Sequence, residues 1–218
     1  MDPRPSRLLD VIAALPDLAL GGVFLVAWIE PVLIGVERIR EGLLLMLLEF
    51  IVIHSAAFMG TAAWGDRPPG KKATFVIGLG LFYTLFVAGF TLAFSTWWPL
   101  IGFWGLTLNR LLGALIGQGE GDEKMLVQRG WATSTLFYLM AVFSTVFIPY
   151  PRLGVTPEVL AQVDLPGSGL WIDRPWSVMA AGFLYFTACG LSELSGHSWL
   201  KGGSREPEAR TEAGSRKP

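Results

Sequence analysis

Five polar residues interrupt long apolar runs in this sequence, and their types could do chemistry: Glu30, Glu49, His54, Asn109 and Arg110. An ionisable side chain inside a lipid bilayer costs roughly 2.5–3.5 kcal/mol, so such residues usually face a protein interior or a wet cavity. Glu30 and Glu49 would form an outer acidic site for a proton or a cation. His54 would titrate near neutral pH beside Asn109 and Arg110. This pattern is typical of a proton or cation pathway.

The same residues also fit a purely structural network. In that interpretation Arg110 is neutralised by a carboxylate or reaches toward the inner interface, and His54 donates to a backbone carbonyl. Depth along the helices places Glu30 level with Glu49 at about 10 Å, and His54 level with Arg110 at about 18–20 Å. Glu49 and His54 point roughly 140° apart around one helix, so their partners must come from other helices. The sequence leaves both interpretations open.

Other chemistries have little support. The two histidines, His54 and His197, lie at depths that differ by about 15–20 Å, too far apart to share a haem. Glu193 and His197 are four residues apart, but two ligands do not make a metal site. The single cysteine, Cys189, excludes an internal disulfide or a cysteine cage. Hydrolase, zinc-helix and phosphate-loop motifs are missing, so the sequence points to no metal and no cofactor. An enzyme is the less expected class, and an intramembrane hydrolase that uses His54 with a serine from another span stays open.

The composition indicates a membrane protein. Hydrophobic residues make up 52% of the 218 positions and charged residues only 16%, so apolar side chains must meet lipid as well as each other. The basic residues are scattered rather than clustered, and nucleic acid is not an expected partner. A transmembrane helix needs about 20 apolar residues, and six stretches qualify, at roughly 16–36, 42–64, 73–95, 97–117, 130–149 and 176–195. We therefore predict an all-α bundle of about six transmembrane spans.

The remaining segments divide the chain further. Residues 1–15 form an N-terminal cytoplasmic or interfacial segment, and Pro16 is expected to interrupt any continuous helix there. Residues 16–199 hold the six-span bundle, in which Ser95–Pro99 makes a tight turn and so pairs the third span with the fourth. The tail, residues 200–218, is rich in Gly, Ser and charged residues and is predicted to be a disordered cytoplasmic segment.

The basic residues also predict the orientation. With six spans, most of the 17 Lys and Arg residues lie on the side of the N-terminus, and the opposite side holds only Arg38, Arg40, Arg152 and Arg174. Cytoplasmic loops carry an excess of Lys and Arg, so both termini are predicted inside, in a bacterial inner membrane. The outer loop, at about 150–175, then contains Thr156, Pro157 and Glu158 in the order of a helix start.

Two stretches carry a resemblance. The string LLEFIVIHSAAFMG in the second span and the stretch Pro175-Trp176 followed by Ala181–Phe186 are similar to segments of a bacterial family of multi-pass integral membrane proteins. The likeness covers about a third of the chain. It implies a multi-pass membrane protein, and no established activity comes with it.

Two functions follow as hypotheses. The first is a structural or accessory subunit of a membrane assembly, with a buried polar network, in which the lipid bilayer and a membrane-protein partner or a second copy are the contacts. Gly102-x-x-Gly105 in the fourth span fits a close helix-packing face of this kind. The alternative is a small proton- or cation-linked transporter that uses Glu30, Glu49, His54 and Arg110.

Overall fold

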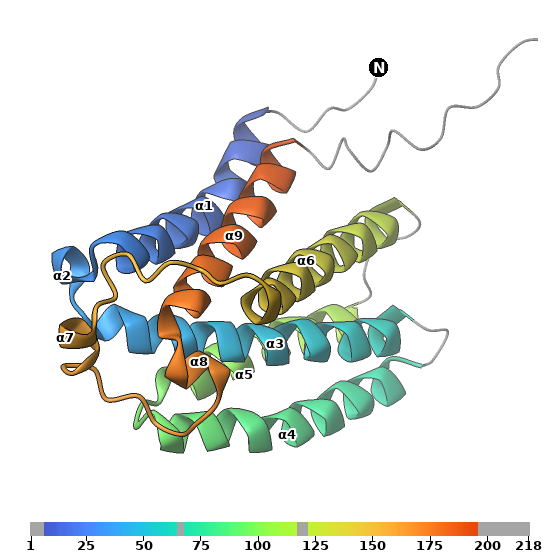
Figure 1. The fold of residues 1–218 in the computed structure, drawn as a ribbon. Helices are drawn as coiled ribbons and strands as arrows, with labels where there is room; N and C mark the ends of the chain where they lie inside the picture. Colours follow the sequence, from blue (N-terminus) through green and yellow to red (C-terminus); the bar gives the residue numbers. More distant parts are fainter. Residues whose placement is uncertain (1–6, 65–67, 117–121, 196–218) are drawn as a thin grey trace, which may run out of the picture.

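The computed structural model describes residues 7–64, 68–116 and 122–195, except for the side chains of 7–10, 60–64, 69, 109–110, 112–116 and 122–129. The described backbone consists of helices and their connections and contains no strand (Figure 1). In chain order the helices are α1 (Arg7–Ile29), α2 (Pro31–Ile34), α3 (Glu37–Trp64), α4 (Pro69–Ala93), α5 (Trp98–Ile116), α6 (Asp122–Phe147), α7 (Pro157–Leu160), α8 (Leu170–Asp173) and α9 (Pro175–Leu194).

Five of these helices are long and apolar enough to cross a membrane. Their apolar stretches are Val11–Ile29, Glu37–Met59, Gly70–Ala93, Gly130–Phe147 and Pro175–Leu194. Lipid cannot satisfy exposed backbone groups, which is why such stretches form helices. The prediction of an all-α membrane protein is confirmed in this form. Helix α5 corresponds to the remaining predicted span, and Trp98–Leu108 is its described apolar part, so the number of six spans stays a prediction.

Helix α1 differs from what its sequence predicts. The helix continues through Pro16, so the predicted interruption there is wrong. A proline removes one backbone hydrogen bond, and helices packed in a membrane bundle tolerate this loss because neighbouring groups compensate for it. Helix α1 ends instead at Ile29, where Glu30 leaves the helical region with φ −147° and ψ 68°. Glu30 precedes Pro31, and a residue before proline is disfavoured in that region.

Helices α1 and α9 form a close antiparallel pair (Figure 1). Glycines make this approach possible, because an added Cβ on Gly21 would lie 2.7 Å from Oγ1 of Thr187. A Cβ on Gly190 would lie 2.7 Å from Cγ of Leu18. Small residues at such contacts let transmembrane helices pack at short distance. The first residues of α1 and the last residues of α9 consequently lie at the same end of the bundle.

Helices α4 and α5 form the predicted neighbouring pair. Between them Ser95 takes a positive φ of 50°, and the two helices pack against each other after the turn. Gly80 faces Thr107 at this contact, where an added Cβ would lie 3.0 Å from the threonine methyl. The prediction of a tight turn followed by a paired helix is therefore confirmed.

The segment between α6 and α9 is fastened to the end of α1. Thr156 caps the one-turn helix α7, since its side chain accepts a hydrogen bond from the backbone N–H of Val159, which confirms the predicted helix start. The indole of Trp28 donates to the carbonyl of Pro151 at 2.8 Å, and Gly154 N–H donates to the carbonyl of Trp28 at 3.1 Å. These bonds hold the loop over one end of the bundle.

Candidate functional site

Glu49 is the sequence-predicted polar residue that the structure places among other helices. It is half-buried on α3, and the hydroxyl of Tyr185 on α9 donates to its Oε1 at 2.6 Å. The side chain of Tyr185 is only 3% exposed. A short hydrogen bond to a group that can be ionised is among the stronger polar contacts. This contact joins two helices whose bonding residues are 136 positions apart.

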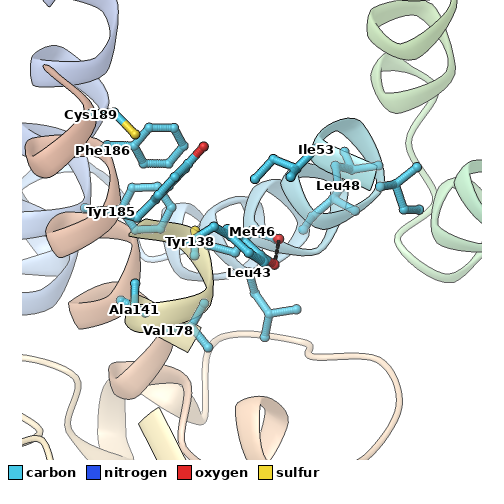
Figure 2. Packing of buried hydrophobic residues seen from close by; sticks show 14 of the residues in the cluster. Leu43, Met46, Leu48, Ile53, Tyr138, Ala141, Val178, Tyr185, Phe186 and Cys189 are labelled. Atoms are coloured by element: carbon cyan, nitrogen blue, oxygen red, sulfur yellow. Dashed lines mark hydrogen bonds between the residues drawn. The ribbon is translucent and has the colours of Figure 1, made fainter. Parts of the chain in front are cut away.

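Tyr138 brings α6 into the same cluster (Figure 2). Its ring meets that of Tyr185 edge to face, with centroids 5.5 Å apart and planes at 88°. Its hydroxyl donates to the backbone carbonyl of Met46 on α3 at 2.7 Å. Edge-to-face aromatic pairs are worth about 0.5–1.5 kcal/mol beyond their burial. Three helices therefore meet around two buried tyrosines.

Two further polar contacts extend the cluster along α6. The thiol of Cys189 on α9 lies 3.9 Å from the hydroxyl of Ser134. One turn earlier, the indole of Trp131 donates to the carbonyl of Ile53 at 3.1 Å. Both contacts cross between helices, so they tie α6 to α9 and to α3. In this region polar groups hold neighbouring helices together.

Acidic groups on α1 and α9 lie near this cluster. Asp17 is close enough to Glu49 and to Glu193 for their charges to interact. One carboxyl oxygen of Glu193 is buried and has no hydrogen-bond partner in the described part of the chain. Among the described residues the ion pair found is that of Arg38 with Glu41. Each of these three acids could take up a proton, and the charge of Asp17 acts on the other two.

The described residues contain no cluster of three or more His, Cys, Asp or Glu side chains with the arrangement of a metal site. Cys189 and the acids do not converge in that way. Within the described chain, the chemistry open to this region is hydrogen bonding and proton uptake by Asp17, Glu49 and Glu193.

The other predicted site residues lie elsewhere. Glu30 is exposed at the break between α1 and α2, while the carboxylate whose charge acts on Glu49 is that of Asp17. His54 is exposed on α3, and its Nδ1 lies 3.1 Å from the carbonyl of Phe50. The His54 and Phe50 rings also lie in contact, with centroids 4.1 Å apart and planes tilted by 45°. This contact with its own helix is the arrangement that the structural interpretation of His54 requires.

Part of the predicted constellation lies outside the described residues. Asn109 and Arg110 belong to the backbone of α5, but their side chains are not among those described. His197 and the tail, residues 200–218, lie entirely outside the described residues. The predicted pairing of Arg110 with His54 therefore stays a prediction.

Sequence reasoning missed the residues that surround Glu49. Tyr185 and Tyr138 were not singled out as polar partners, although both stand in the middle of apolar helices. Tyr185 lies ten residues into α9 and Glu49 lies twelve residues into α3, which is about 15 Å and about 18 Å from the starts of the two helices at the helical rise. Applying the depth argument to tyrosines as well as to charged residues would have selected it. Asp17 carried a weaker signal, since it stands near the start of an apolar run.

Comparisons with known protein families, with curated proteins and with solved structures find no match for this chain. The resemblance to a bacterial multi-pass family accordingly stays a prediction. No relative contributes an activity, and the functional argument depends on the geometry described above.

Proposed function

We propose that this chain is a structural or accessory subunit of a membrane assembly, in which interior polar groups fasten the helices and an outward face of α4 receives a partner helix. The hydrogen bonds of Tyr185 with Glu49 and of Tyr138 with Met46 support the first part. In these two bonds, polar groups between α3, α6 and α9 are bonded to each other and do not line an open cavity. Neither Glu49 nor His54 lines the two grooves described for this fold.

The observation that carries the proposal is the open glycine face of α4. An added Cβ on Gly78 or on Gly89 would meet no atom within 4 Å. These two residues are eleven positions apart, which places them about 20° from each other around the helix. Leu85 lies on the same face and is 71% exposed. Beside Gly78 the surface forms a groove of about 420 Å³, between Lys71, Thr74, Phe75 and Leu79.

Glycine on this face has a cost that a partner would offset. A glycine inside a helix is less favourable than alanine by roughly 0.5–1 kcal/mol. Where α1 meets α9, glycines such as Gly21 allow close helix contact. Gly78 and Gly89 give α4 the same kind of surface with no helix of the described chain against it. Small-residue faces of this type are where transmembrane helices associate.

A matched pair of substitutions tests this proposal. Gly78→Leu fills the α4 groove, whereas Gly22→Leu adds the same side chain at an exposed glycine of α1 that also meets nothing within 4 Å. Tagged protein is extracted in mild detergent and the co-purified polypeptides are quantified by mass spectrometry. We expect a partner at a fixed ratio to the native chain and to the Gly22 variant, with a severalfold loss for the Gly78 variant. Equal recovery from both variants would exclude the α4 face as the docking surface.

A small proton- or cation-linked transporter is the second candidate, and the interior position of Glu49 together with the buried carboxyl oxygen of Glu193, unpartnered among the described residues, favours it. Among the described side chains that the sequence assigns to this role, Glu49 has an interior partner, while Glu30 and His54 are exposed. In proteoliposomes this function requires a proton flux that Glu49→Gln abolishes. Flux that is absent, or that the variant leaves intact, argues against it.

We also propose the location and orientation. The close pairing of α1 with α9 brings the start of α1 and the end of α9 to one end of the bundle, which supports an even number of crossings and both termini on the cytoplasmic side of a bacterial inner membrane. Single cysteines placed near each terminus should be labelled by a membrane-impermeant reagent only after the cells are opened. Labelling of one terminus in intact cells would contradict this topology.

A further inference from the structure

A groove of about 780 Å³ lies between α1, α3 and the start of α5, away from the Glu49 cluster. Its walls are apolar except at one place, where Arg38 and Glu41 form an ion pair. The apolar walls include Leu20, Val23 and Ala27 of α1 and Leu45 of α3. A volume of this size is typical of sites for small organic ligands.

The charges and the apolar walls are separated along the groove. Arg38 and Glu41 stand in the first two turns of α3, at the end where α1 finishes and α5 begins. Along α1, Leu20 lies seven residues deeper than Ala27, which is about 10 Å at the helical rise. Trp98 borders the charged end, and tryptophan is common at the level of lipid head groups. The groove is thus polar at the membrane interface and apolar toward the bilayer centre.

Gly42 allows the floor of the groove to form. An added Cβ there would lie 2.9 Å from Cε of Met179 and 3.0 Å from Cε1 of Phe24. Both side chains line the groove and are buried to 2% exposure or less. The floor is therefore fixed by tight packing, and the space above it does not depend on a side chain moving away.

We propose that this groove binds one zwitterionic phospholipid, with an acyl chain along α1 and the head group at the ion pair. The phosphate would accept from the guanidinium of Arg38, and the ammonium group would lie against Glu41. Both side chains remain accessible, at 51% and 50% exposure. The bond to Glu41 uses one nitrogen of the Arg38 guanidinium, which has five N–H donors in all. An anionic head group matches only half of this pair, because its charge would also face Glu41.

Native mass spectrometry of the full chain in mild detergent tests the head-group preference. Dioleoyl phosphatidylethanolamine and dioleoyl phosphatidylglycerol are added in turn, and the retained lipid is counted. We expect one retained phosphatidylethanolamine, favoured about tenfold over phosphatidylglycerol, the ratio that one charge-assisted hydrogen bond supplies. Glu41→Gln should shift the preference toward phosphatidylglycerol, and Arg38→Gln should weaken both lipids. The exposed Arg174→Gln should change neither.

A filling substitution tests the position of the acyl chain. Val23→Trp occupies the groove, and Val11→Trp places the same ring outside it on the same helix, at a residue of nearly equal exposure (46% and 43%). Retention of the lipid should fall for the Val23 variant and stay native for the Val11 variant. Equal retention of both lipids by the native chain, or unchanged retention by Val23→Trp, would overturn the proposal. A polypeptide bound in place of lipid would overturn it as well.

Discussion

The hydrogen bond between Tyr185 and Glu49 can be removed by deleting a single oxygen atom. Tyr185→Phe deletes the hydroxyl that donates to the carboxylate at 2.6 Å and keeps the ring against Tyr138. The carboxylate then loses its described side-chain partner inside the bundle. We expect the variant to fold and to be less stable than the native chain.

The size of the effect follows from the environment. Hydrogen bonds between transmembrane helices contribute about 0.6 kcal/mol on average and up to about 1.7 kcal/mol in double-mutant cycles. The short distance and the ionisable acceptor place this bond in the upper part of that range. We therefore expect Tyr185→Phe and Glu49→Met to show a coupling energy of about 1–1.5 kcal/mol. Tyr138→Phe removes a hydroxyl bonded to a backbone carbonyl and not to the carboxyl group of Glu49, so its coupling with Glu49→Met should be smaller than that of Tyr185→Phe.

The free energies of unfolding can be measured by reversible SDS titration in mixed micelles, followed by tryptophan fluorescence. Each single variant and each double variant is compared with the native chain. Coupling of Tyr185→Phe with Glu49→Met that is no larger than that of Tyr138→Phe would refute the assignment of this bond as the link between α3 and α9.

Two further substitutions test the segment that closes one end of the bundle. Gly154→Ala should destabilise the chain by about 2 kcal/mol or more, as overpacking does, because its Cβ would lie 2.7 Å from the carbonyl carbon of Ile29. The control is Gly89→Ala, whose Cβ meets nothing within 4 Å. This control should be neutral or stabilising in the same SDS titration. The pKa of Glu158 is lowered by the hydrogen bond from Thr156 and by a backbone hydrogen bond, so its stabilising contribution is present above the ordinary carboxyl pKa and is lost as the pH falls through the lowered value. An NMR titration should show this midpoint move upward in Thr156→Ala, and an unchanged midpoint would contradict the hydrogen bond between Thr156 and Glu158.

Local signals predicted much of the fold. The turn at Ser95–Pro99 and the cap at Thr156 depend on a few neighbouring residues, and both appear where the sequence places them. The apolar runs predicted the long helices because a helix forms its backbone hydrogen bonds within its own segment, so it too depends on local sequence. The predicted helix break at Pro16 is absent from the structure. The packing of α1 against α9 outweighs the one backbone hydrogen bond that the proline removes.

The candidate site was less predictable because it depends on which helices are neighbours. The angle between Glu49 and His54 indicated different surroundings, and one is half-buried while the other is exposed. The partner of Glu49 could not be chosen, because Tyr185 reaches it only through the packing order of α3, α6 and α9. That order depends on long-range contacts such as Gly21 against Thr187, which no local pattern specifies.

The mass of the intact particle, extracted from its native membrane in mild detergent, tests the central claim most directly. If the chain is an accessory subunit, we expect a particle that contains this chain and a second polypeptide at a fixed ratio. The Gly78→Leu variant should lose the second polypeptide. A particle made of this chain alone, whose proteoliposomes carry protons in a Glu49-dependent manner, would contradict the claim and favour a transporter.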